Sequence, residues 1–310
     1  MIRVNLSLSQ LRRKNKVNQT LGSFLEDKRS MLNQQMEQQI YSMQIPETLR
    51  KSIMYSIEAG GKRIRPVLLL AANEAFGGEE NRAIAPACAV EMIHTYSLIH
   101  DDLPAMDDDD VRRGKPTNHV QFDEATAILA GDGLLTAAFH VVTSNDHLSD
   151  REKVFLTREL SKASGAEGMV AGQMLDMEAE GQTLSLEGLE AIHRHKTGEL
   201  IRFSAVAGAF IGGADSSQLH HIETYAKYIG LLFQVQDDIL DVVGEEGEIG
   251  KPVGSDVSNN KSTYPQLLGL EGAIKHKNQY AERARKALKE AGVESTLLED
   301  LIDFISARKN

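Results

Sequence analysis

The sequence predicts an all-α protein folded as a single domain. From Gly22 onward, apolar residues recur with a period of about 3.6, and short runs of Gly, Pro, Ser or Asp interrupt them, as expected for successive helices. Strand signals are nearly absent, because alternating polar and apolar runs are rare and aromatic residues make up only 5% of the chain. No linker or fixed-period repeat divides the 310 residues, although this length alone would allow about two domains.

The expected helices follow one another through short connections. They cover residues 22–42, 47–59, 65–76, 86–103, 123–145, 150–164, 167–179, 187–213, 216–243, 263–271, 273–291 and 295–308. Ser185 and Ser216 are expected to cap the helices that they precede, because a serine hydroxyl can accept a hydrogen bond from an unpaired N–H of the first turn.

Residues 1–22 differ from the rest of the chain. They contain five basic residues and no acidic one. An arginine-rich, acid-poor start is also typical of a transit peptide, but the polar composition without clear periodicity favours a disordered basic extension. The folded domain is therefore expected to cover residues 23–310.

Composition excludes several classes of function. A net charge of −11 argues against a nucleic-acid partner. The single cysteine, Cys88, lies in an apolar run and is expected in the core, which suits a reducing cytoplasm. No apolar stretch approaches the roughly 18–20 residues of a membrane span, and the longest, Phe203–Ala214, has twelve residues.

Aspartates gather at the end of the expected helix 86–103. Six of the ten residues from Asp101 to Asp110 are aspartates. A solvated acidic loop is one interpretation. The alternative is a site for Mg²⁺, which binds carboxylate oxygens, because carboxylates at the end of a buried helix need a compensating cation. Pro104 should break the helix and let Asp107 return toward Asp101.

A second aspartate cluster follows another apolar helical run. Asp237 and Asp241 are four residues apart, so on a helix they share one face, and Gln234 lies on that face too. Two inward-facing clusters could hold a polyanion between them through bridging metal ions. The recurrence of this unusual feature favours the metal interpretation over the solvated loop.

Four motifs occur in a fixed order along the chain. They read GGKRIRP at Gly60–Pro66, DDLPAMD at Asp101–Asp107, HKTGEL at His195–Leu200 and DDILD at Asp237–Asp241. With these motifs, residues 25–308 resemble the trans-isoprenyl diphosphate synthases, and among them the bacterial type of farnesyl diphosphate synthase (geranyltranstransferase). The resemblance implies an antiparallel helical bundle of the isoprenoid synthase type around a central active-site cavity, and a homodimer.

The resemblance also implies an activity. It is the magnesium-dependent head-to-tail condensation of isopentenyl diphosphate with dimethylallyl and geranyl diphosphate to give farnesyl diphosphate, with three Mg²⁺ ions. The implied metal ligands are Asp101, Asp107, Asp237 and Asp241, with a contribution from Asp102, while Asp108–Asp110 are expected to face solvent.

The remaining implied site residues bind the two substrates. Isopentenyl diphosphate would be held by Lys62, Arg65, His94 and Arg113, and the allylic diphosphate by Arg112, Lys196, Lys251 and Lys261. Gln173 and Asp176 would line the site, and Thr197 and Gln234 would place oxygen dipoles beside the reacting carbons. Helical geometry supports His94, because seven residues bring it almost back to the face of Asp101.

Product length should depend on the floor of the cavity below Asp101. By resemblance, Tyr96 is the bulky residue that stops growth at fifteen carbons. Ideal helical geometry instead puts Ser97 closer to the face of Asp101, about 40° away against about 140° for Tyr96. The alternatives are a geranylgeranyl diphosphate synthase, a class I terpene cyclase and a non-catalytic partner subunit. The isopentenyl-site cations count against the last two.

Overall fold

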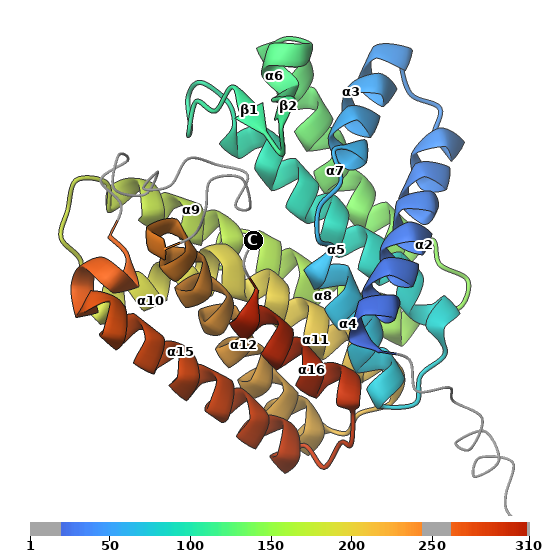
Figure 1. The fold of residues 1–310 in the computed structure, drawn as a ribbon. Helices are drawn as coiled ribbons and strands as arrows, with labels where there is room; N and C mark the ends of the chain where they lie inside the picture. Colours follow the sequence, from blue (N-terminus) through green and yellow to red (C-terminus); the bar gives the residue numbers. More distant parts are fainter. Residues whose placement is uncertain (1–19, 244–261, 309–310) are drawn as a thin grey trace, which may run out of the picture.

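The computed structural model describes residues 20–243 and 262–308, and helices dominate these residues (Figure 1). The helices are α2 Leu21–Ser42, α3 Glu47–Glu58, α4 Ile64–Ala75, α5 Glu80–Asp101, α6 Asn118–Gln121, α7 Glu124–Thr143, α8 Asp150–Ser164, α9 Met169–Glu178, α10 Leu186–His193, the π-helical segment η1 Arg194–Gly198, α11 Glu199–Gly212, α12 Ser216–Val243, α15 Tyr264–Glu290 and α16 Thr296–Ala307. A single two-stranded hairpin, β1 Val111–Arg112 and β2 Lys115–Pro116, accompanies them in the described ranges. The predicted all-α class is confirmed.

Most predicted helix bounds differ from the observed ones by three residues or fewer. Helix α5 is the exception at its start, since it begins six residues before Pro86, which lies inside it. The predicted helix 187–213 is three elements, because η1 separates α10 from α11. The predicted break near residue 272 occurs at Gly269, whose non-helical φ of 70° kinks α15.

Helix capping followed the prediction at one position of two. The Ser185 side chain accepts a hydrogen bond from the N–H of Gly188 and caps α10. At α12 the prediction was wrong, because the Asp215 carboxylate, and not Ser216, accepts from the N–H of Gln218 at 2.9 Å. Asp215 stands one residue earlier and its carboxylate makes the stronger cap at a helix N-terminus.

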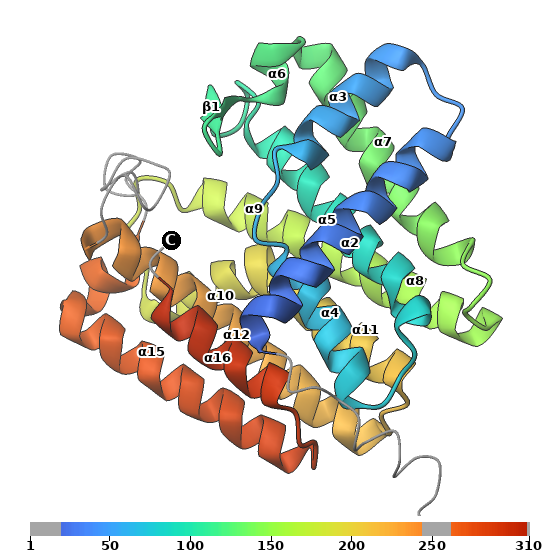
Figure 2. The same ribbon diagram turned by 45° about the vertical axis from the view of Figure 1, so that its right-hand side comes forward.

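Helices α4, α5 and α11 form the centre of the molecule. Most residues of α4 and α11 are buried, and α4 packs against both α11 and α5. In both views α12, α15 and α16 lie side by side at one edge, whereas α3 and α7 lie toward the other (Figures 1 and 2). Cys88 is buried in α5 as predicted, and this burial raises the pKa of its thiol to about 12.

Helix α7 is unusual for its exposed apolar surface. Within the described residues it alone is long and apolar enough to cross a membrane, contrary to the expectation that no apolar stretch approaches that length, and 44% of its apolar window is buried in the protein. Ile128 and Leu129 remain 42% and 59% exposed. On α9, Val170, Met174 and Met177 are also exposed.

The N-terminal extension lies largely outside the described residues, so residues 1–19 of the expected 1–22 have no structural counterpart here. Leu21 and Gly22 already belong to α2, whose first turn is capped by the Thr20 side chain. The helical domain therefore includes the last residues that the sequence analysis assigned to the extension.

Candidate active site

A cavity of about 340 Å³ opens where five helical elements meet. The end of α5, the C-terminal half of α9, helix α10, the π-helical segment η1 and the last turns of α12 all contribute to it, together with the residues before α15. Its lining includes eight residues that the sequence analysis named, which are Asp101, Asp107, Arg112, Asp176, Lys196, Thr197, Gln234 and Asp237. Asp101 and Asp237, 136 positions apart in the chain, thus share one cavity.

The first aspartate cluster folds as Pro104 predicts. Helix α5 ends at Asp101, and the chain after it turns back, so that the N–H of Asp107 donates to the carbonyl of Asp101 at 2.8 Å. This hydrogen bond brings two aspartates six residues apart to the same cavity. Asp108, Asp109 and Asp110 are exposed, as expected.

Asp101 has an electrostatically costly position. The pKa of its carboxyl is raised to about 6, mainly by burial and to a smaller extent by the charge of Asp107, although Lys196 and Arg112 oppose the shift. The side-chain amide of Gln173 donates a hydrogen bond to Asp101. A buried carboxylate that keeps an elevated pKa despite nearby cations favours a site that gains charge compensation when a ligand binds.

Asp102 faces away from this pair. Its side chain is 4% exposed, and it accepts a hydrogen bond from Nε of Arg112 at 2.6 Å. It is absent from the cavity lining. The geometry therefore gives Asp102 a partner in Arg112, and its predicted contribution to metal binding stays a prediction.

The hairpin after the first cluster carries two arginines. Its two-residue turn has positive φ at both central positions, 55° at Arg113 and 75° at Gly114, as a type I′ turn requires. The guanidinium of Arg113 donates to the carbonyl of Gly60. A Cβ atom on Gly61 would collide with this guanidinium, so the glycine allows the GGKRIRP turn and the hairpin to meet.

The GGKRIRP turn is fixed by its middle arginine. Arg63 has a left-handed φ of 53°, and its side chain is 1% exposed. Its guanidinium donates to Glu91 of α5 at 2.6 Å, to Asn33 of α2 at 3.0 Å and to the carbonyl of Ile57 at 2.6 Å. The buried ion pair with Glu91 thus holds the turn that carries Lys62 and Arg65.

The predicted isopentenyl-site residues gather behind this turn. Burial lowers the pKa of His94 well below its usual value, and four arginines lower it further, namely Arg65, Arg113, Arg63 and Arg112. His94 is therefore neutral at pH 7. Nε of Arg65 is buried without a hydrogen-bond partner. A cluster of basic side chains that includes a hydrogen-bond donor without a partner is suited to bind an anion.

Lys62 belongs to the same basic cluster. Partial burial lowers the pKa of its ammonium group, and the charges of Arg308 and Arg113 lower it further, whereas Asp237 raises it. Lys62 therefore interacts electrostatically with both the basic cluster and Asp237 of the second aspartate cluster.

The HKTGEL motif overlaps the π-helical segment η1, Arg194–Gly198. Nζ of Lys196 binds the Asp176 carboxylate of α9 at 2.6 Å. Helix α9 can lie close to η1 because Gly172 has no side chain; a Cβ atom there would overlap the backbone of Lys196. A π-helical turn is frequent at functional sites. Here it turns Lys196 and Thr197 into the cavity.

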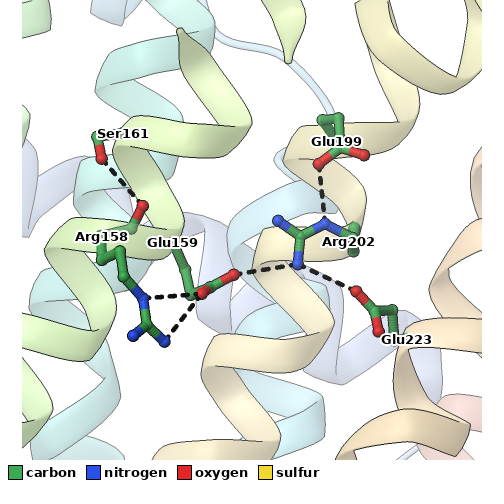
Figure 3. A network of polar contacts seen from close by, with 6 residues as sticks. All are labelled: Arg158, Glu159, Ser161, Glu199, Arg202 and Glu223. Atoms are coloured by element: carbon green, nitrogen blue, oxygen red, sulfur yellow. Dashed lines mark hydrogen bonds and ion pairs between the residues drawn. The ribbon is translucent and has the colours of Figure 1, made fainter. Parts of the chain in front are cut away.

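An ion-pair network lies behind this segment (Figure 3). Arg202 of α11 binds Glu199 at 2.8 Å, Glu159 of α8 at 3.2 Å and Glu223 of α12 at 3.4 Å. Glu199 directly follows η1. The network therefore anchors the end of the π-helical segment to two neighbouring helices.

In the second aspartate cluster, only part of the predicted face reaches the cavity. Asp237 is 45% exposed and lines it together with Gln234. Asp241 is 3% exposed and does not line it. Asp238, which the sequence analysis left without a role, does line it.

Asp237 has a partner that the sequence did not indicate. Nη2 of Arg308, at the end of the described chain, lies 2.6 Å from its carboxylate, and the guanidinium stacks on the ring of Phe233, 3.9 Å from its centre. The backbone carbonyl of Arg308 accepts from Gln236 at 2.8 Å. No sequence motif marks Arg308, because it comes from the other end of the chain.

Other predicted residues lie away from the cavity or outside the described chain. Lys251 and Lys261 fall in residues 244–261, which the structure does not describe. Tyr96 and Ser97 are 6% and 8% exposed and do not line the cavity, which Leu98 does. The ring of Tyr96 packs edge-on against His100 in the next turn.

The carboxylates fit a particular kind of metal site. Among residues 20–243 and 262–308, no three His, Cys, Asp or Glu side chains lie close enough to hold a metal ion by themselves. Mg²⁺ commonly binds through one or two carboxylates and completes its shell with water and phosphate oxygens. Asp101 and Asp107 on one wall and Asp237 on another suit such shared coordination.

Comparisons with known proteins agree with this arrangement. A profile of the polyprenyl synthetase family matches residues 46–302. The farnesyl diphosphate synthase of Geobacillus stearothermophilus is 51% identical over 291 residues, which cover 93% of this chain and 98% of that protein. The chloroplastic geranylgeranyl pyrophosphate synthase of Catharanthus roseus is 45% identical over 291 residues, covering 93% and 81%.

A solved structure gives the same result for the fold. The crystal structure of a putative farnesyl-diphosphate synthase from Marinomonas sp. MED121 superposes with a TM-score of 0.80 at 42% identity. The match covers 93% of this chain and 99% of that one.

Proposed function

The chain belongs to the polyprenyl synthetase family, and from this premise we propose that it condenses isopentenyl diphosphate with dimethylallyl and then geranyl diphosphate to give farnesyl diphosphate. The observation that carries the proposal is that a set of carboxylates and a set of basic side chains meet at one cavity. Carboxylates of Asp101, Asp107 and Asp237 face one cavity, and beside it lies a basic cluster in which Nε of Arg65 has no hydrogen-bond partner. Two diphosphates with their metal ions would balance both sets of charges.

The metal proposed here is Mg²⁺, held by Asp101, Asp107 and Asp237. Asp241 and Asp102 are weaker candidates on this geometry, because both are buried and neither lines the cavity. Bound there, Mg²⁺ would supply Lewis-acid stabilisation of the diphosphate leaving group.

Cationic side chains of the chain do the rest of the binding. Lys196 and Arg112 line the cavity and stabilise the allylic diphosphate as its C–O bond ionises. The oxygen atoms of Thr197 and Gln234 face the resulting allylic cation. Lys251 and Lys261 remain proposed ligands of the same diphosphate.

Isopentenyl diphosphate is held so that its double bond attacks the cation. The residues that hold it are Lys62, Arg65, His94 and Arg113. The carbon skeleton then loses a proton to the departing diphosphate. Neutral His94 takes part as a hydrogen-bond donor, because its pKa is lowered well below the usual range.

We also propose a homodimer in the cytoplasm. The exposed apolar residues of α7 and α9 offer a surface that a second copy would cover. This arrangement also accounts for the high hydropathy of α7 without a membrane.

The first test is incubation of the purified protein with isopentenyl diphosphate, dimethylallyl diphosphate and MgCl₂. A fifteen-carbon product that disappears with EDTA is the expected result. A twenty-carbon product would keep the chemistry and favour a geranylgeranyl diphosphate synthase, an activity also found among the relatives. No condensation would contradict the proposal.

Product length has its own test in Tyr96→Ala. The large-to-small change opens space one turn below Asp101, beside His100. We expect a shift from fifteen-carbon to longer products, measured by chromatography of the dephosphorylated alcohols. Ser97→Ala tests the other candidate floor residue, and Tyr41→Ala, at an exposed side chain of α2, is the control. An unchanged product distribution in Tyr96→Ala would remove this residue as the floor.

A further inference from the structure

Asp238 and its neighbour Asp237 have different surroundings although both carboxylates border the cavity. The side chain of Asp237 is 45% exposed, whereas that of Asp238 is 7% exposed. Adjacent residues on a helix point about 100° apart, so the two carboxylates leave α12 in different directions. Asp238 points toward the start of α15.

The Asp238 carboxylate meets the first residue of α15. Its Oδ2 atom accepts a hydrogen bond from the backbone N–H of Tyr264 at 2.9 Å. The first four N–H groups of a helix have no partner within the helix. Thr263 and Gln266 satisfy two donors through a capping box, and Asp238 supplies the acceptor for another from a different helix. A negative charge at this helix end is also favourable.

The start of α15 forms part of the cavity wall. Ser262 and Thr263 line the cavity, as Lys196 and Asp176 do. The Ser262 hydroxyl donates to the carbonyl of Gln182 at 3.2 Å and accepts from the N–H of Leu184 at 3.4 Å. This corner therefore connects the start of α15 to the connection between α9 and α10.

Tyr264 fixes the corner from behind. It is fully buried, and its ring stacks on His193, another cavity residue, with centroids 5.9 Å apart. Its hydroxyl lies 3.3 Å from that of Tyr280, which donates to Glu190 at 2.6 Å. A shift at the N-terminus of α15 would move this whole wall.

We propose that Asp238 is a positioning residue that holds the N-terminus of α15 against the allylic side of the cavity, and that it binds no metal. The inference rests on the proposed function for its kinetic part. It separates the aspartates of the second cluster by role, with Asp237 facing the ligands and Asp238 acting through the backbone of Tyr264.

The test compares Asp238→Asn with Asp238→Ala. The asparagine keeps an oxygen that can accept the Tyr264 N–H but is a poor magnesium ligand. We expect Asp238→Asn to retain activity within about threefold. Asp238→Ala loses the acceptor, and its KM for the allylic diphosphate should rise about tenfold, with the KM for isopentenyl diphosphate and the half-saturating Mg²⁺ concentration unchanged.

A second readout does not depend on activity. Amide hydrogen exchange at Tyr264 should accelerate about tenfold or more in Asp238→Ala and stay slow in Asp238→Asn. Asp123→Ala is the matched control, since Asp123 caps α7 by accepting the Thr126 N–H at 2.8 Å away from the cavity. It should change neither KM nor exchange at Tyr264.

The outcomes separate the two proposals. If wild-type protein forms no prenyl product, the proposed function fails, and exchange at Tyr264 still decides the role of Asp238. If Asp238→Asn is as inactive as Asp237→Asn and needs more Mg²⁺, Asp238 is a metal ligand and the inference is overturned. Unchanged exchange at Tyr264 in Asp238→Ala overturns it equally.

Discussion

The two aspartate clusters use the same residue type on opposite kinds of backbone. The first lies where α5 ends, and its members Asp101 and Asp107 meet because the chain folds back after Pro104. The second lies on α12, which continues unbroken to Val243. There, Asp237 reaches the cavity, while Asp241, one turn later, is buried.

The difference shows what residue spacing can and cannot predict. Four residues on an intact helix guarantee a shared face, but the cavity covers only part of that face. A broken helix releases the next residues from that constraint, so six residues can close a pair. Of the predicted metal ligands, the first cluster therefore brings Asp101 and Asp107 to the cavity, and the second brings Asp237.

The largest expected effect comes from a substitution in the first cluster. Asp101→Asn removes a charge from the proposed metal pair, and we expect kcat/KM to fall on the order of a thousandfold or more, because metal stabilisation of a leaving group contributes several kcal/mol. Steady-state kinetics with saturating Mg²⁺ measures this loss.

The matched change in the second cluster is Asp241→Asn. Because Asp241 does not line the cavity, its loss should be at least about tenfold smaller than that of Asp101→Asn. Equal losses at both positions would contradict the asymmetry between the clusters.

The sequence predicted the parts of this site that depend on local rules. Helical periodicity placed most helices, and Pro104 predicted the break that returns Asp107. Contacts between distant segments escaped it. Asp237 pairs with Arg308, 71 positions later in the chain. Asp238 binds the backbone N–H of Tyr264, and no pattern of residue types in the sequence indicates a contact to a backbone group. The π-helical turn at Lys196 depends on packing against Gly172, which periodicity does not encode.

A change of intermediate size tests the backbone of the first cluster. Pro104→Ala restores an N–H and permits helix at Leu103, which favours continuation of α5. In a continuous helix Asp107 would leave the face of Asp101. We expect activity to fall about tenfold and the half-saturating Mg²⁺ concentration to rise, because the carboxylates of Asp101 and Asp107 would then less often be close enough to bind one metal ion together.

Pro46→Ala is the control, because Pro46 directly precedes α3 and lies outside the cavity lining. Full activity and unchanged Mg²⁺ dependence in Pro104→Ala would show that the turn forms without the proline. The N–H of Asp107 on the carbonyl of Asp101 would then be sufficient to hold it.

The smallest effect concerns stability without metal, where the two clusters should respond in opposite directions. The pKa of Asp101 is raised to about 6, mainly by burial. Between its ordinary pKa of 3.8 and this value, the folded state binds more protons than the unfolded state, so stability falls as pH rises through that window. Asp101→Asn should therefore stabilise the metal-free protein above pH 6 by about 1–3 kcal/mol and leave it unchanged near pH 4.

Asp237→Asn should have the reverse effect. Its carboxylate pairs with Arg308, whose side chain is only 4% exposed. Removing the charge leaves a buried guanidinium with a weaker partner, which should destabilise the protein by about 1–3 kcal/mol. Urea unfolding at pH 7.5 in EDTA measures both variants, and a shift of the same sign in the two would mean that both clusters are compensated alike before any ligand binds. Opposite signs would show that the chain itself neutralises the second cluster and leaves the first to the metal.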